Sequence, residues 1–198
     1  MTERKVLTIP NMISFTRLGL VGVFAALFVP GTHDLAAYLV LAVIGISDWL
    51  DGFIARKTGQ VTELGKLLDP LSDRIVIVVS MLLLAFRGAI DLRLAAVILL
   101  RDLLVIVIFP VLEARGVPRV PVNKVGKAAT GSIFTGMGTA AASLVVPVGL
   151  GVPVRYVSLA FLLLGAALYW IAGAMYIAAI RKQIEPKGSS VASSAPDN

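Results

Sequence analysis

The stretch YVSLAFLLLGAALYWIAGAMYIAAI, residues 156–180, decides the fold class of this chain. A helix needs about 20 mainly apolar residues to cross about 30 Å of hydrocarbon, and this stretch reaches that length without a charged residue. A helix also keeps its backbone hydrogen bonds internal, as hydrocarbon requires. We therefore predict a membrane-spanning helix over these residues.

The rest of the 198-residue chain repeats this pattern. Apolar residues make up 58% and charged residues 15%, against about 45–50% and 25% in soluble domains. We predict an all-α integral membrane fold of six transmembrane helices, in one domain over 1–184 with a disordered Ser/Ala/Pro-rich tail over 185–198. The expected spans are 11–30, 35–56, 65–86, 90–112, 125–147 and 156–180.

The first span is the weakest, because its uninterrupted apolar run covers only 18–29. We expect residues 9–16 to form a short N-terminal interfacial helix, with Arg17 extending its guanidinium toward water.

In 125–147, small residues recur at every fourth position, which allows close helix contacts within a bundle or across a homodimer. Trp49, Trp170 and Tyr169 are expected to be interfacial or core aromatics.

Lysine and arginine counts set the orientation. With the N-terminus inside, fourteen of these residues fall in inner segments and three, Arg87, Arg93 and Arg155, in outer connections. This bias predicts a multi-pass protein of the cytoplasmic membrane with both termini cytoplasmic. The net charge of +6 is interspersed between apolar runs, so it indicates anionic lipid headgroups and not nucleic acid.

Five acidic residues lie inside the apolar blocks: Asp48, Asp51, Asp69, Asp73 and Asp102. Insertion scales put an Asp at mid-bilayer at about 2.5–3.5 kcal/mol. The first two are three residues apart and the next two four apart, so each pair shares a helix face. Because the linker 57–64 is short, both pairs lie at one depth beside the cytoplasm and can converge.

Four converging carboxylates repel one another unless a cation lies between them. Oxygen ligands without nearby His or Cys favour Mg²⁺, Mn²⁺ or Ca²⁺. Simpler explanations exist for single residues: Asp69 before Pro70 can cap a helix, and Asp73 can pair with Arg74 or Lys66. These explanations leave the shared depth of the four carboxylates unexplained.

Residues 48–73 carry a longer pattern. DWLDGFIAR at 48–56, eight further residues and GKLLDPLSD at 65–73 resemble the signature of the CDP-alcohol phosphotransferase family, D-x2-D-G-x2-A-R-x8-G-x3-D-x3-D, at all eight fixed positions. The resemblance extends to the six-span layout and to IPNMISFTR at 9–17. It implies a six-helix membrane fold, a homodimer and a polar cavity that faces the cytoplasm.

The same resemblance implies roles for individual residues. Asp48, Asp51 and Asp69 would bind two ions, Mg²⁺ or Mn²⁺, that hold the pyrophosphate of a CDP-linked donor. Asp73 would also touch a metal and act as general base. The residues implied in contacts with the CDP moiety are Asp51, Gly52, Arg56 and Gly65, with Asn11 and Arg17 as further candidates.

The chain offers no covalent route at an inner site. It has no cysteine, and its only histidine, His33, falls in an outer connection, which excludes a Ser–His or Cys–His nucleophile there. What remains is attack by an acceptor hydroxyl on the donor phosphorus, with a carboxylate taking the proton, metals neutralising charge and CMP leaving.

The second half of the chain bears on the acceptor. Arg101-Asp102 resembles the cardiolipin synthases of the family, whereas its phosphatidylglycerophosphate synthases usually carry Arg-Glu there and Gly-Lys-x-Lys-Thr where this chain has GKAAT at 126–130. The resemblance favours CDP-diacylglycerol as donor and phosphatidylglycerol as acceptor, with glycerol 3-phosphate as the alternative and inositol phosphate more remote. Candidates for holding the acceptor's phosphate are Arg101, Arg115, Arg119, Lys124 and Lys127.

Those basic residues also have structural explanations. Arg101 and Asp102 can pair with each other or with neighbouring helices, and the other four can form an ordinary positive-inside loop.

Two rival functions use similar parts. A prenyltransferase has its Asp-rich motifs far apart in sequence, and a cation carrier places acidic residues along a path across the bilayer. Here four lie at one level, within one short stretch.

Overall fold

The computed structural model contains six α-helices and no strand in the part of the chain that it describes. That part is the backbone of residues 9–58, 63–114 and 124–184, with the side chains of 12, 14–47, 71–108, 124–147, 149–178 and 180. The six-helix prediction is confirmed there. The helices are α1 (Ile9–Phe28), α2 (Asp34–Thr58), α3 (Glu63–Phe86), α4 (Leu92–Ala114), α5 (Lys124–Ala142) and α6 (Val148–Ile184).

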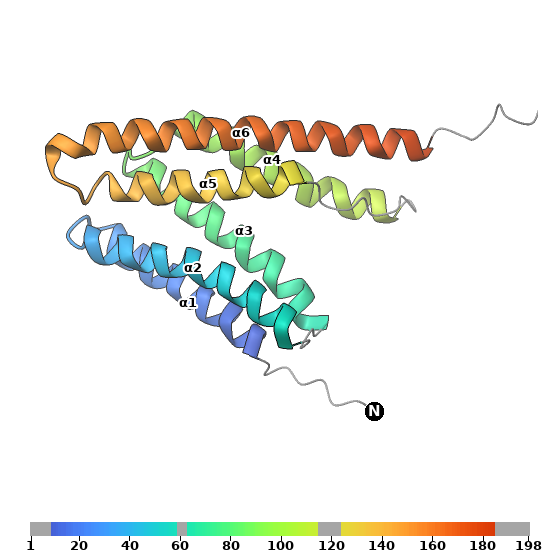
Figure 1. Ribbon diagram of the computed structural model, residues 1–198, viewed down its shortest axis with the longest axis horizontal. Helices are drawn as coiled ribbons and strands as arrows, with labels where there is room; N and C mark the ends of the chain where they lie inside the picture. The colour runs from blue at the N-terminus through green and yellow to red at the C-terminus, as the bar shows by residue number, and fades with distance from the viewer. Residues whose placement is uncertain (1–8, 59–62, 115–123, 185–198) are drawn as a thin grey trace, which may run out of the picture.

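The helices alternate in direction (Figure 1). The starts of α1, α3 and α5 and the ends of α2, α4 and α6 lie toward the right-hand side of Figure 1. The most extensive packing joins α5 to α6, while α1 packs against both α2 and α3, and α4 contacts α3 and α6. Among the described residues α3 therefore has α1, and not α2, as its principal neighbour.

Helices α5 and α6 pack closely, and this contact depends on two glycines. A Cβ on Gly136 would lie 2.6 Å from Cγ of Leu162, and one on Gly165 would lie 2.7 Å from Cγ1 of Ile133. The hydroxyl of Ser158 donates to the carbonyl of Gly136 at 2.8 Å. The small-residue face predicted in 125–147 is thus used inside the bundle.

The outer surface of the bundle is apolar. Large apolar side chains on α1, α2, α3, α4 and α6 are exposed, among them Val43, Leu82, Leu103 and Leu163, as expected where the solvent is hydrocarbon. By length and composition, one segment of the described residues, Gly149–Ala178, is long and apolar enough to cross a membrane. Two shorter apolar segments are Ser14–Phe28 and Asp34–Ser47.

Three predicted boundaries need correction. Helix α5 ends at Ala142 and α6 begins at Val148, instead of 147 and 156, because the chain turns before Pro147. Proline disfavours helix in the residue before it, and the carbonyl of Pro147 accepts the amide of Leu150 at 2.8 Å to open the new helix. The separate interfacial helix over 9–16 is also wrong, because those residues are the first turns of the continuous α1.

The end opposite the acidic motif is held by arginines. Arg87 forms an ion pair with Asp34, donates to the carbonyl of Phe28 at 3.2 Å and stacks over the Phe28 ring at 4.7 Å. Arg155 donates to the carbonyl of Gly88 at 2.6 Å. These contacts tie the connection between α1 and α2 to the end of α3, and tie the connection between α3 and α4 to α6.

Candidate active site

The acidic motif spans the facing ends of α2 and α3. The chain passes from the end of α2 at Thr58 to the start of α3 at Glu63. At a rise of 1.5 Å per residue, Asp48 lies about 15 Å from the end of α2 and Asp73 about 15 Å from the start of α3. Asp51 and Asp69 each lie about 10 Å from the same two helix ends. Both of those ends lie on the same side of the molecule (Figure 1). The backbone therefore agrees with the shared depth of the two pairs.

Only one of the four carboxylates has a described side chain. Those of Asp48, Asp51 and Asp69 lie outside the described side chains, as do those of Arg56 and Asn11. Gly52 lies on α2 and Gly65 on α3, also in the stretch of undescribed side chains. Their predicted ligand contacts stay predictions.

Asp73 is bound by Arg17. The Nη1 of Arg17 on α1 lies 2.5 Å from Oδ1 of Asp73 on α3. The Arg17 side chain is only 2% exposed, whereas that of Asp73 is 40% exposed. The prediction that Arg17 extends toward water is therefore wrong, because a carboxylate inside the bundle compensates its charge.

One of the two ion-pair partners suggested for Asp73 can be checked, because Arg74 has a described side chain and Lys66 does not. The suggested partner Arg74 turns away and binds Asp102 on α4 instead. Consecutive residues of a helix point about 100° apart, so Asp73 faces α1 while Arg74 faces α4. Because α1 contacts α2 as well, Asp73 faces the side of α3 on which α1 and α2 lie.

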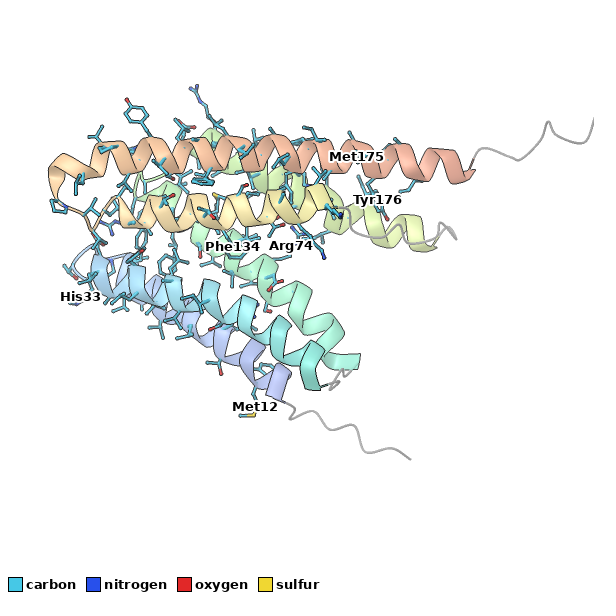
Figure 2. The ribbon with its side chains drawn as sticks, in the orientation of Figure 1. Met12, His33, Arg74, Phe134, Met175 and Tyr176 are labelled. Carbon is cyan, nitrogen blue, oxygen red and sulfur yellow. The ribbon has the colours of Figure 1, made fainter. Side chains whose placement is uncertain are left out.

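A second polar cluster lies on the face of α3 that meets α4. Arg74 donates to Asp102 and, at 2.6 Å, to the hydroxyl of Tyr169 on α6. Arg101 lies 3.3 Å from the same Asp102 oxygen, and its guanidinium stacks on the Tyr169 ring at 3.9 Å from the centroid. We call these four residues the α3–α4–α6 cluster; Figure 2 shows its member Arg74 in the middle of the bundle.

The cluster has a buried half and a more open half. The side chain of Asp102 and the residue Tyr169 are each 3% exposed, whereas the side chains of Arg74 and Arg101 are 29% and 14% exposed. Two guanidinium groups share one carboxylate, so the cluster carries one excess positive charge. The other carboxylate oxygen of Asp102, Oδ2, has no hydrogen-bond partner among the described residues.

Arg101 and Asp102 contact each other, and Asp102 contacts Arg74 on α3, as the structural explanation expects; the acceptor-binding role of Arg101 stays a prediction. Lys124 and Lys127 are exposed in the first turn of α5, as a positive-inside segment would be. The remaining acceptor candidates, Arg115 and Arg119, lie outside the described residues.

Tyr169 is the contribution that sequence reasoning missed. It was expected to be an interfacial or core aromatic, and its burial agrees with that, but its hydroxyl and its ring each hold an arginine. The available signal was the set of intramembrane charges: Arg74 and Arg101 need polar partners, and a tyrosine offers a hydroxyl and a π face together.

An apolar cavity of about 520 Å³ lies between α3 and α4. It is lined by side chains such as Val78, Leu99 and Leu103, and its one charged lining residue is Asp102. Such a lining suits hydrocarbon better than a nucleotide. Of the α3–α4–α6 cluster, the cavity touches Asp102 alone.

The donor set of the acidic motif fits a hard divalent cation. It consists of carboxylates, and oxygen ligands are those that Mg²⁺ and Mn²⁺ favour. Asp73 is exposed enough for a ligand to reach it. Within the described side chains no three His, Cys, Asp or Glu residues come together to hold a metal, so the fit rests on Asp73 and on the backbone positions of the other three.

Comparison with known proteins gives a consistent result. The profile of the CDP-alcohol phosphatidyltransferase family matches residues 7–178. The "Cardiolipin synthase (CMP-forming)" of Streptomyces coelicolor is 37% identical over 188 residues, which cover 91% of this chain and 86% of that protein. The "Putative cardiolipin synthase" of Mycobacterium tuberculosis is 37% identical over 139 residues, covering 70% of this chain and 66% of that protein.

A relative with another acceptor in its name matches less of the chain. The "CDP-diacylglycerol--glycerol-3-phosphate 3-phosphatidyltransferase" of Pseudomonas fluorescens is 39% identical over 103 residues, covering 50% of this chain and 53% of that protein. Similarity to these two bacterial proteins named cardiolipin synthase or putative cardiolipin synthase thus extends further along the chain.

Proposed function

Because this chain belongs to the CDP-alcohol phosphatidyltransferase family, a family of membrane enzymes, we propose that it transfers the phosphatidyl group of CDP-diacylglycerol to phosphatidylglycerol. The products are cardiolipin and CMP. The observation that carries the choice of acceptor is the similarity to a cardiolipin synthase along nine-tenths of the chain. Glycerol 3-phosphate is the alternative acceptor, favoured only by a match over half of the chain.

The reaction that we propose is a direct displacement at phosphorus. A hydroxyl of the acceptor attacks the phosphatidyl phosphorus, the bond from that phosphorus to the CMP oxygen breaks, and the hydroxyl proton passes to the carboxylate of Asp73. The exposed part of Asp73 can meet the hydroxyl while Arg17 holds Oδ1 from the buried side. A general base at this position contributes a factor of about 10²–10⁴ in rate.

Members of this family use a divalent metal, and in this chain we propose two ions, Mg²⁺ or Mn²⁺. Asp48, Asp51, Asp69 and Asp73 would hold them, and bound ions would neutralise the charge that develops on the pyrophosphate. Gly52 and Gly65 would let the CDP moiety approach the backbone closely. Arg56, Asn11 and Arg17 complete the proposed set on the donor side.

The proposed topology has six spans, with both chain ends and the acidic motif on the cytoplasmic side. It follows from the lysine and arginine bias and from the alternating helix directions (Figure 1). Because the chain has no cysteine, His33→Cys and Lys124→Cys each introduce a single thiol. In intact cells an impermeant maleimide should label the first and not the second; the reverse pattern would overturn the topology.

The acceptor is tested by identifying the product. Purified protein is incubated with CDP-diacylglycerol, Mg²⁺ or Mn²⁺ and either phosphatidylglycerol or glycerol 3-phosphate, and the lipid is identified by mass spectrometry. We expect cardiolipin, with one CMP released for each molecule formed. Phosphatidylglycerophosphate as the sole product would replace the proposed acceptor, and release of pyrophosphate would indicate a prenyltransferase.

We also propose that the enzyme is a homodimer. The apolar surface that the helices leave exposed can pack against a second copy as well as against lipid. Light scattering of the protein in detergent, with the micelle mass subtracted, should give twice the 20.9 kDa chain mass. A monomer mass at all protein concentrations would refute the dimer without bearing on the reaction.

A further inference from the structure

The α3–α4–α6 cluster has features that charge neutralisation inside a bundle does not require. A carboxylate balances one guanidinium, yet here Arg74 and Arg101 both contact the same oxygen of Asp102. Two neighbouring cations repel each other, so neutralising Asp102 does not require the second arginine. An arrangement of two arginines suits a phosphate, which accepts several N–H groups at once.

The burial pattern points the same way. The groups that hold the arginines, Asp102 and Tyr169, are almost fully buried, while the arginines keep the more exposed positions of the cluster. Tyr169 holds Arg74 through its hydroxyl and Arg101 through its ring. Neither guanidinium can reorient freely while both contacts exist, which reduces the entropy lost when a ligand binds.

The position of the cluster relates it to the acceptor. Arg74 directly follows Asp73 in α3, and the two residues face different neighbours, α4 and α1. The motif proposed to bind the donor lies on α2 and α3. A phosphate bound at Arg74 and Arg101 therefore lies on the α4 side of α3, about 100° around the helix from Asp73 and one residue along it.

We propose that Tyr169 and Asp102 are positioning residues that hold Arg74 and Arg101 as a paired binding site for the phosphate of a glycerol phosphate ester, the acceptor. This inference rests on the proposed function and deepens it. The phosphate can be the diester of phosphatidylglycerol or the monoester of glycerol 3-phosphate, because both present anionic oxygens to the same guanidinium groups.

The test separates acceptor binding from donor binding. Tyr169→Phe removes one oxygen atom and keeps the ring beneath Arg101, so it should fold normally; Tyr156→Phe, on the exposed outer part of α6, is the matched control. For Tyr169→Phe we expect the KM of the acceptor to rise about tenfold, as for the loss of one hydrogen bond to a charged group. The KM of CDP-diacylglycerol should stay within about twofold.

Asp102 supplies a second, independent variant. Asp102→Asn keeps the shape and removes the charge that holds both arginines, so the acceptor KM should rise at least as much as in Tyr169→Phe. Asp102→Glu restores the charge and should recover part of the loss. Equal increases in the two KM values, or no recovery with glutamate while the variants keep the wild-type Tm, would overturn the positioning role.

Running each variant with both acceptors distinguishes the two phosphate sources and the two hypotheses. A KM effect confined to phosphatidylglycerol identifies a diester site, and one confined to glycerol 3-phosphate identifies a monoester site. If the wild-type enzyme uses only glycerol 3-phosphate, the proposed function fails while the KM comparison still tests the cluster. Unchanged acceptor KM in every variant refutes the cluster alone.

Discussion

Removing the carboxylate of Asp73 should destabilise this protein more than removing the charge of its partner, Arg17. The side chain of Arg17 is 2% exposed and that of Asp73 is 40% exposed. Asp73→Asn therefore leaves a buried cation facing a neutral amide. Arg17→Met leaves a carboxylate that water can still reach, and methionine fills most of the vacated volume.

The size of the difference follows from the burial of each partner. Removing one partner of a fully buried ion pair costs about 3–5 kcal/mol. Here one partner is half-exposed and Arg17 has further contacts, so for Asp73→Asn we expect about 2 kcal/mol, between the buried and surface limits. For a chain of this length that corresponds to a fall in Tm of about 4–8 °C. Arg17→Met should cost about half as much.

The assay is thermal unfolding in detergent with EDTA present, followed by tryptophan fluorescence, so that metal binding does not contribute. The decisive comparison is the double variant Arg17→Met/Asp73→Asn. Because it also removes the buried cation that has lost the Asp73 carboxylate, it should unfold at a higher temperature than Asp73→Asn alone. A double variant whose Tm losses simply add, or an Arg17→Met that is the less stable single variant, would refute the buried-cation argument.

Three further predictions concern catalysis, metal and packing. Asp73→Asn should retain binding of CDP-diacylglycerol while CMP release falls by about 10²–10⁴-fold; substantial residual turnover would remove Asp73 as the base. Asp69→Asn should weaken the Mn²⁺-dependent rise in Tm and donor binding together, and a loss of only one of them would separate the two sites. Gly136→Ala should cost about 1–3 kcal/mol through the clash with Leu162, whereas Gly138→Ala, whose Cβ would meet open space, should be neutral or stabilising; equal Tm values would show that α5 and α6 adjust without cost.

The spacing of the acidic residues was readable from the sequence because helical geometry is periodic. Pairs at three and four residues share a face in any helix, and a short linker between two spans places their pairs at one depth. The helix count followed equally from the lengths of the apolar blocks. The ends of α5 and α6 did not, since the residues around Pro147 are as apolar as the spans, and local backbone constraints set those boundaries.

The partners of the intramembrane charges could not be read in this way. The sequence establishes that Arg17, Arg74, Arg101 and Asp102 lie within apolar blocks, and the cost of a charge there requires that each find compensation. Which residue supplies it depends on how the helices rotate and which ones touch. Arg17 is 56 residues from Asp73, and Arg74 is 95 residues from Tyr169.

The sequence by itself determined a helical membrane protein with a carboxylate motif at one depth, because hydrophobicity and helical period act locally along the chain. Only the tertiary structure decided that α3 separates two polar regions, Asp73 with α1 on one side and Arg74 with α4 and α6 on the other. The physical reason is that adjacent residues of one helix point in different directions, and the packing of distant helices decides what each one meets.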